Sequence, residues 1–144
     1  MINGINSREM ILEILLEIEE GEHSHVAIRN ALSKYQFLPK QDRAFITRVC
    51  EGTLEYRIQI DYIINSFSKV TVDKMKPAIR EILRSAVYQL KYMDSVPDSA
   101  VCNEAVKLAQ RKGFYNLKPF VNGVLRTAAR QMNELEYPSR EENL

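Results

Sequence analysis

The stretch Pro119-Phe120-Val121-Asn122-Gly123-Val124-Leu125-Arg126 decides the fold class of this chain. Proline suits the first turn of a helix, where its missing N–H would have no partner in any case. At about 100° per residue, the apolar residues of this stretch and of its continuation to Met132 share one side of a helix. Asn122, Gly123 and Arg126 fall on the other side. This pattern predicts an amphipathic helix that packs on a core through one side.

Gly123 stands on the polar side of this predicted helix. Glycine inside a helix costs about 1 kcal/mol relative to alanine, so we expect the missing side chain to serve a purpose. Two purposes are open: a close crossing by a neighbouring helix, which we favour, or close approach of a ligand or phosphate beside Arg126 and Arg130. The packing alternative predicts that Gly123→Leu destabilises the protein by about 1–3 kcal/mol through overpacking.

The rest of the chain also has apolar residues at helical spacing, and no window alternates as a strand does. Asn6 and Ser24 are expected to cap the first two helices, and Gly21 and Gly113 to follow the first and the sixth. The apolar period from 41 to 67 is interrupted at Gly52-Thr53, which suggests two helices or one bent helix. A further helix is expected over about 75–93, with Pro77 in its first turn. We therefore predict an all-α protein of about seven helices.

Composition places the chain among ordinary globular domains. It has 144 residues, 45% of them hydrophobic and 27% charged, with a formal net charge of +1. This length suits a single domain with a sizeable core. Cys50 and Cys102 lie far apart, as buried thiols in a reducing compartment do. Without a membrane-length apolar run or a signal peptide, a soluble cytoplasmic domain is expected.

The charges are unevenly distributed along the sequence. From Lys107 to Met132 there are six basic residues and no acidic one, whereas the first helix has five glutamates against the single Arg8. Such segregation predicts a one-sided electrostatic surface that suits a polyanion, although the cations could also be plain solvated faces of two helices. The candidate residues for contact with a nucleic acid are Lys107, Arg111, Lys118, Arg126 and Arg130, with Arg80 and Arg84 as a possible extension.

Patterns that would support catalysis are missing from the sequence. No glycine-rich loop follows a strand, so we expect no nucleotide or S-adenosylmethionine site in this chain. Neither cysteine has a nearby histidine to act as a base. His23 and His25 are two residues apart beside a helix start, and we expect them to be exposed residues and not metal ligands. No catalytic, cofactor or metal site is therefore assigned.

Several motifs, in this order and spacing, resemble the NusB-like family of all-α RNA-binding domains. They are Gln41-Asp42-Arg43-Ala44-Phe45, Glu51-Gly52-Thr53-Leu54, Ile82-Leu83-Arg84, Tyr88-Gln89-Leu90, Val96-Pro97, Asn103-Glu104-Ala105-Val106 and Phe120 to Arg126. The resemblance implies seven helices in two packed subdomains and RNA as the partner. It also implies a domain over residues 1–135, with residues 136–144 beginning a linker toward a catalytic domain outside this chain.

Two branches of that family imply different functions. The resemblance of Asn-Gly-Val-Leu-Arg, ending at Arg126, is to the N-terminal domain of RsmB/Sun-type ribosomal RNA methyltransferases. That domain would position small-subunit ribosomal RNA for an S-adenosylmethionine-dependent half that makes 5-methylcytosine, and we favour it. The alternative is a free-standing transcription antitermination factor that binds boxA-like RNA with a ribosomal protein. The glutamate-rich first helix argues against this alternative, and a protein-only docking module is a third reading.

Because the sequence has no phosphate-cradling loop, we expect S-adenosylmethionine to bind to residues outside this chain, and this expectation can be tested directly. Isothermal titration calorimetry of this chain with S-adenosylmethionine should show no saturable heat, because no stretch of it forms a nucleotide-binding fold. A micromolar dissociation constant would contradict the assignment of the cofactor to residues outside the chain.

Overall fold

A computed structural model describes residues 6–138, which form seven α-helices and three short 3-10 helices, with no strand among them. The all-α prediction is confirmed. None of the helices in these residues is long and apolar enough to cross a membrane. The elements are α1 (Ser7–Glu19), α2 (Ser24–Lys34), α3 (Lys40–Glu55), α4 (Arg57–Phe67), η1 (Val72–Lys74), α5 (Pro77–Tyr92), α6 (Asp98–Arg111), η2 (Tyr115–Leu117), α7 (Lys118–Gln131) and η3 (Met132–Glu134).

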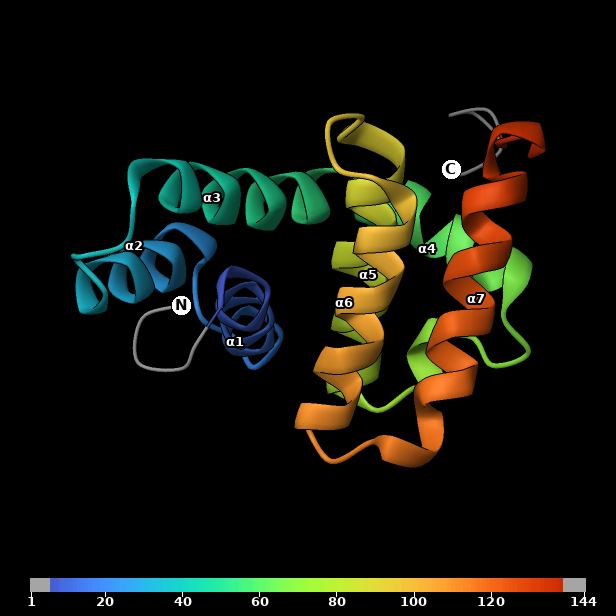
Figure 1. The fold of residues 1–144 in the computed structure, drawn as a ribbon, viewed down its shortest axis with the longest axis horizontal. Helices are drawn as coiled ribbons and strands as arrows, with labels where there is room; N and C mark the ends of the chain where they lie inside the picture. Colours follow the sequence, from blue (N-terminus) through green and yellow to red (C-terminus); the bar gives the residue numbers. More distant parts are fainter. Residues whose placement is uncertain (1–5, 139–144) are drawn as a thin grey trace.

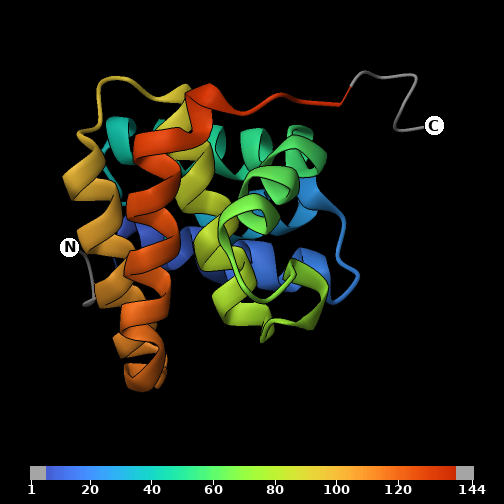
Figure 2. The same cartoon turned by 90° about the vertical axis from the view of Figure 1, so that its right-hand side faces the viewer.

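The helices form two groups that share α5. Helices α1–α3 lie on one side of the molecule and α4–α7 on the other (Figure 1). Helix α5 contacts α1 and α3 in the first group and α4, α6 and α7 in the second. Helices α6 and α7 run side by side along one edge, as both views show (Figures 1 and 2). The molecule is thus assembled around α5.

Helix α5 is buried on nearly every side. Its apolar residues Ile82, Leu83 and Val87 are at most 1% exposed, and the polar Glu81 and Gln89 are buried as well. Burying a large apolar side chain stabilises a fold by about 1.5–3 kcal/mol, but a buried polar group destabilises it unless it is hydrogen-bonded. The polar groups of α5 therefore need partners on the surrounding helices.

Arg8 of α1 donates to Gln89, whereas Glu81 is paired by arginines of α5 that in turn reach carboxylates of α1 and α4. The Arg84 guanidinium donates to both carboxylate oxygens of Asp61 in α4, at 2.8 Å each, and to Glu81 at 2.7 Å. Arg80 pairs with Glu19 of α1 and donates to the carbonyl of Val72 at 3.0 Å. Burial raises the pKa of the Glu81 carboxyl, and both arginines oppose that rise. This network holds α1, η1 and α4 against α5.

Most helix ends lie where the sequence predicts them. The Asn6 side chain caps α1 by accepting the backbone N–H of Glu9 at 2.8 Å. Pro77 is in the first turn of α5. Gly113 follows α6 with a φ of 88°, a left-handed conformation that glycine adopts without strain. These three predictions are confirmed, but Ser24 is the first residue inside α2, after His23, and its side chain does not cap the helix.

The break between α3 and α4 is not where the sequence predicts it. Helix α3 continues through Gly52 to Glu55, and the break is at Tyr56. Gly52 is buried, and a Cβ there would overlap the Tyr88 ring of α5. This glycine therefore permits close packing of α3 on α5 and does not end the helix.

Gly123 has the opposite environment. It is exposed, and no atom lies within 4 Å of a Cβ built at this position. The prediction that Gly123 serves helix packing is therefore wrong, as is the expected overpacking by Gly123→Leu. The polar side of α7 faces solvent at this position.

The chain after η3 crosses back over α4. The Tyr62 hydroxyl donates to the carbonyl of Glu136 at 2.7 Å, and the Tyr137 hydroxyl donates to the carbonyl of Met132 at 3.2 Å. Of the expected linker over 136–144, residues 136–138 therefore contact the helical domain. Residues 139–144 lie outside the described residues.

The two helical glycines give a matched pair of substitutions. Gly52→Ala should destabilise the protein by about 1–3 kcal/mol, because the new methyl group overlaps a tyrosine ring that is itself buried. Urea unfolding followed by circular dichroism measures the change.

Gly123→Ala is the control, because it makes the same chemical change on an exposed helical surface. It should stabilise the protein by up to about 1 kcal/mol through helix propensity alone. A Gly52→Ala variant as stable as the parent would contradict the role assigned to the contact with Tyr88.

Candidate functional site

Helices α6 and α7 present two adjacent rows of polar side chains. Arg126 Nη2 in α7 donates to Asn103 Oδ1 in α6 at 2.8 Å, and Lys118 Nζ donates to Gln110 Oε1 at 2.8 Å. These two contacts fix an antiparallel register, so that Lys107 lies level with the middle of α7. We call this surface the α6/α7 face; its members are Asn103, Lys107, Gln110, Tyr115, Lys118, Asn122, Gly123, Arg126 and Arg130.

Arg126 is positioned by neutral groups only. Its Nε donates to Asn122 Oδ1 at 3.1 Å, one turn earlier in α7, and its Nη2 donates to Asn103. Among residues 6–138, no carboxylate pairs with Arg126 or Arg130. The two amides orient the guanidinium without neutralising it. A guanidinium fixed in this way can bind a phosphate with two parallel hydrogen bonds.

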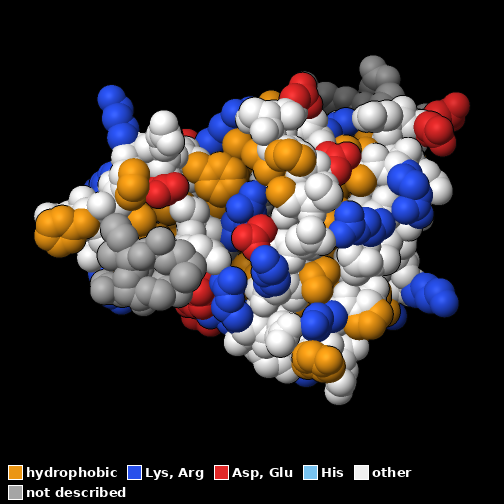
Figure 3. Space-filling model, viewed as in Figure 1, with side chains coloured by type: hydrophobic (Ala, Val, Ile, Leu, Met, Phe, Trp, Pro, Cys, Tyr) orange, Lys and Arg blue, Asp and Glu red, His pale blue; other side chains and the backbone are white. Residues whose placement is uncertain are grey.

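Other members of the face add cations and an aromatic ring. Arg130 is exposed one turn after Arg126, with only a long 3.5 Å contact to Thr127. Lys118 Nζ lies 4.6 Å from the centre of the Tyr115 ring, which is 63% exposed. Lysine and arginine side chains are spread over α6 and α7 on the side shown in Figure 3. Cations beside an exposed aromatic ring suit a single-stranded nucleic acid, whose phosphates pair and whose bases stack.

Lys107 and Arg111 are less available than the sequence suggests. Lys107 is exposed but lies 3.7 Å from Glu104. Arg111 lies 3.7 Å from Glu9 of α1, and its neighbour Lys112 pairs with Glu9 at 3.3 Å and with Glu13 at 2.6 Å. The acidic helix α1 is therefore beside the end of α6 and partly neutralises it. The expected one-sided charge distribution is wrong at this end of the face.

Arg80 and Arg84 are not brought together with the α6/α7 face. Their side chains are only 14% and 12% exposed and are engaged by Glu19, Asp61 and Glu81. A phosphate would have to replace a carboxylate in this network. Both arginines therefore support α5, and the candidate site is centred on Lys118, Arg126 and Arg130.

Sequence reasoning missed the polar side chains that orient these cations. Asn122 could have been noticed, since it precedes Arg126 by four residues and so lies one turn away on a helix. The sequence gives no local signal for Asn103, Gln110 and Tyr115, because only the packing of α6 against α7 brings them to the site.

The cysteines and histidines lie apart from this site. Cys50 and Cys102 are fully buried free thiols. Burial raises the pKa of the Cys50 thiol to about 12, so it is not a thiolate nucleophile at neutral pH. His23 and His25 are exposed at the start of α2, as predicted. Within residues 6–138 no three histidine, cysteine or acidic side chains are grouped so as to hold a metal ion.

Known proteins similar to this chain fall into two groups. A probable ribosomal RNA small subunit methyltransferase B of Bacillus subtilis is 33% identical over 124 residues, which cover 86% of this chain but 28% of the methyltransferase. A transcription antitermination protein NusB of Dictyoglomus thermophilum is 32% identical over 130 residues, which cover 90% of this chain and 85% of that protein. The chain thus spans little more than a quarter of the methyltransferase.

The fold is also found among solved structures. A crystal structure of the antitermination factors NusB and NusE in complex with double-stranded RNA matches with a TM-score of 0.78 and 20% identity, over 86% of this chain and 93% of that one. The model of the NusB family matches residues 5–130. This match covers all seven α-helices except the last residue of α7, and the chain therefore belongs to the NusB family.

Proposed function

We propose that this protein binds RNA through the α6/α7 face. The observation that supports this most directly is the geometry of Arg126, which two amide oxygens orient while no carboxylate of residues 6–138 neutralises it. A guanidinium that neutral acceptors hold in one direction keeps its positive charge available to an anionic ligand. A phosphate diester supplies that charge and matches the guanidinium fork.

The same face offers more than one kind of contact to RNA. Arg126, Arg130 and Lys118 would bind successive phosphates, which position an RNA without reading its sequence. The exposed ring of Tyr115 would stack on an unpaired base. Gly123, which leaves open space between Asn122 and Arg126, would let the sugar-phosphate backbone come close to α7. In support, a NusB protein of this fold has been solved in complex with RNA.

The chain is similar both to antitermination factors and to a domain of a methyltransferase, and the antitermination factor has the better support. The similarity to the Dictyoglomus NusB protein extends over most of both chains, whereas the methyltransferase is matched over 28% of its length. We therefore propose a NusB-type factor that binds a boxA-like RNA together with a small ribosomal protein. A cytoplasmic location is part of this proposal.

The second candidate is the accessory domain of a ribosomal RNA 5-methylcytosine methyltransferase. It is favoured by the 33% identity to the Bacillus enzyme and by Arg126, which ends the Asn-Gly-Val-Leu-Arg motif. In this setting the domain would position ribosomal RNA, while S-adenosylmethionine and the catalytic residues would belong to sequence outside this chain.

Substitution of the two arginines tests the RNA surface. The double change Arg126→Ala and Arg130→Ala should weaken binding of a boxA-type RNA and of a ribosomal RNA hairpin. It should also reduce the slope of log affinity against log salt concentration by about one to two units, since each phosphate contact contributes about 0.7–0.9. Fluorescence anisotropy at several salt concentrations measures both quantities.

Lys69→Ala with Lys74→Ala removes the same charge from the distant η1 region and should leave the slope nearly unchanged. Asn103→Asp should imitate the loss of Arg126, because it places a carboxylate where an amide now accepts its hydrogen bond. If the arginine variant keeps its affinity and slope while circular dichroism shows an intact fold, the RNA surface lies elsewhere.

The two settings differ in what the ribosomal protein contributes. For an antitermination factor, adding the ribosomal protein should raise the affinity for boxA-type RNA by about tenfold or more relative to a ribosomal RNA hairpin, because two proteins then contact one RNA. Stronger binding of the hairpin, unchanged by the ribosomal protein, would support the methyltransferase domain instead. Both results are compatible with RNA binding by the α6/α7 face. This experiment therefore distinguishes an antitermination factor from a methyltransferase domain and does not test the RNA surface.

A further inference from the structure

A second surface, away from the α6/α7 face, gathers five of the seven tyrosines of the chain. Tyr56 directly precedes α4, Tyr62 lies in the middle of α4, Tyr88 and Tyr92 lie near the end of α5, and Tyr137 belongs to the segment after η3. Three of them border an open groove of about 750 Å³ that extends to Ile58, Gln59 and Pro138. We call it the tyrosine groove.

The tyrosine rings form a fixed wall. The Tyr56 ring stacks on Tyr92 with centroids 4.5 Å apart, and the Tyr88 centroid is 5.3 Å from that of Tyr92. The Tyr92 hydroxyl is hydrogen-bonded to Gln59, and the Tyr62 hydroxyl donates to the Glu136 carbonyl. Because these hydroxyls already have partners, the groove offers ring surfaces to a ligand. Ile58 is 76% exposed and Tyr56 is 38% exposed, so the apolar surface is open.

One end of the groove is formed by the segment that follows η3. Leu135, at the start of the segment that ends at Pro138, has a ψ of 140°, and the Tyr137 ring lies 5.5 Å from that of Tyr62. The Tyr62 hydroxyl donates to a backbone carbonyl of this segment. Aromatic walls with such a donor recognise extended and polyproline-type segments in proteins. The contact of Tyr62 with this segment therefore supports a peptide as the ligand of the groove.

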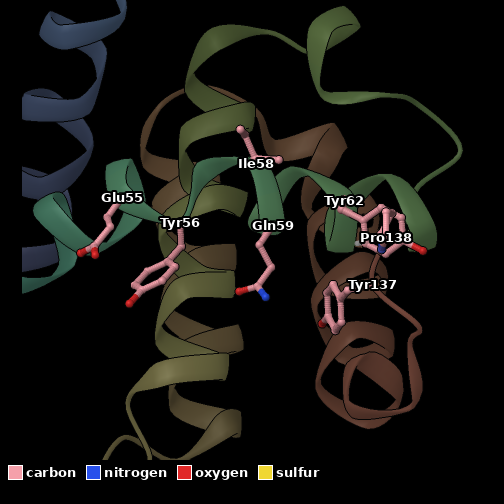
Figure 4. Close-up of a pocket in the computed structure, with 7 residues that line it drawn as sticks. All are labelled: Glu55, Tyr56, Ile58, Gln59, Tyr62, Tyr137 and Pro138. Atoms are coloured by element: carbon pink, nitrogen blue, oxygen red, sulfur yellow. The ribbon is translucent and has the colours of Figure 1, made fainter. Parts of the chain in front are cut away.

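The remaining part of the groove has room for a further short segment. Figure 4 shows Tyr56, Gln59 and Tyr62 following one another along α4, with Tyr137 and Pro138 at the far end. Six residues of helix extend about 9 Å, which corresponds to about three residues of an extended peptide.

The charge of the groove selects between a peptide and a nucleic acid. Of the lining residues within 6–138, Glu55 alone is charged. Its carboxylate would repel a phosphate backbone and attract an arginine or lysine. Lys91 Nζ lies 5.1 Å from the Tyr137 ring centre and 5.7 Å from that of Tyr92, so the Tyr137 end already has a cation. Glu55 lies at the opposite end (Figure 4), where we expect the arginine or lysine of a ligand to bind.

We propose that the tyrosine groove docks an extended segment of a partner protein, with a proline or aromatic residue against Tyr56 and Ile58 and an arginine or lysine against Glu55. This surface is separate from the α6/α7 face, so the proposal does not depend on RNA binding. A partner bound here would leave Arg126 and Arg130 accessible.

A tryptophan-containing peptide is a clean probe, because the chain has no tryptophan. The acetylated, amidated tetrapeptide Arg-Pro-Trp-Pro should show a saturable change in tryptophan emission when the full chain is added. The same peptide with Glu in place of Arg should bind at least about fivefold more weakly, since it meets the Glu55 carboxylate. In NMR titrations the amide shifts should lie at residues 56–62 and at Glu136 and Tyr137, and not at Gly123.

Variants of the exposed lining residues test the assignment without disturbing the core. Ile58→Asp should weaken peptide binding by about tenfold, as expected for loss of an apolar anchor. Glu55→Lys should reverse the preference between the two peptides. Phe37→Asp makes a comparable apolar-to-acidic change at an exposed residue of the α2–α3 loop and should have no effect.

Other occupants would give different results, each of which overturns the proposal. Failure of the peptide to saturate, or amide shifts outside the groove, would contradict a peptide site. Amide shifts of residues 56–62 with an RNA oligonucleotide would assign the groove to nucleic acid. Loss of a dimer on Ile58→Asp, seen by sedimentation, would assign it to a second copy. Peptide binding only by a chain that ends at Pro138 would assign it to residues 139–144.

Discussion

The burial of α5 on nearly every side is the constraint on which the rest of the structure depends. A helix surrounded by five others must bring its polar groups into the interior, where an unpaired charge is very unfavourable. Arg84 resolves this by joining Asp61 of α4 to Glu81 of α5 itself. Removing one member of such a buried pair generally costs about 3–5 kcal/mol, because the other charge loses its partner. The packing of α5 then positions both surfaces, since α6 and α7 rest on it and Tyr88 and Tyr92 belong to it.

Among the cations of α5, α6 and α7, two groups differ in their side-chain acceptors. Arg80, Arg84 and Lys112 are bound by carboxylates, so their charge is neutralised within the fold. Arg126 and Lys118 are bound by neutral amide oxygens, which fix the direction of the side chain and leave its charge available to a ligand. For these residues the acceptor decides how much charge is left for a phosphate, since Arg126 and Lys118 meet no carboxylate among residues 6–138.

The two surfaces have opposite chemistry and are joined by one segment of chain. The α6/α7 face is cationic and suits a polyanion, whereas the tyrosine groove is apolar with a single carboxylate and suits a basic peptide. Helix α7 leads directly through η3 to Tyr137, whose ring forms part of the groove. The two surfaces are thus rigidly linked by α7 and by the contacts of Tyr137 with α4. A protein that assembles an RNA with a protein partner needs such a separation, since like surfaces would compete for one ligand.

The sequence by itself determined the helices and much of their ends, because those depend on residues a few positions apart. The apolar period gave seven helices, Asn6 predicted the cap of α1, and Arg126 and Arg130 fell on the polar side of α7. The tertiary structure alone decided the rest. Gly52 and Gly123 look alike in sequence, yet one meets a tyrosine ring and the other meets solvent. Likewise, Arg111 and Lys112 belong to the acid-free stretch but pair with α1, because long-range packing, which no local pattern encodes, places that helix beside them.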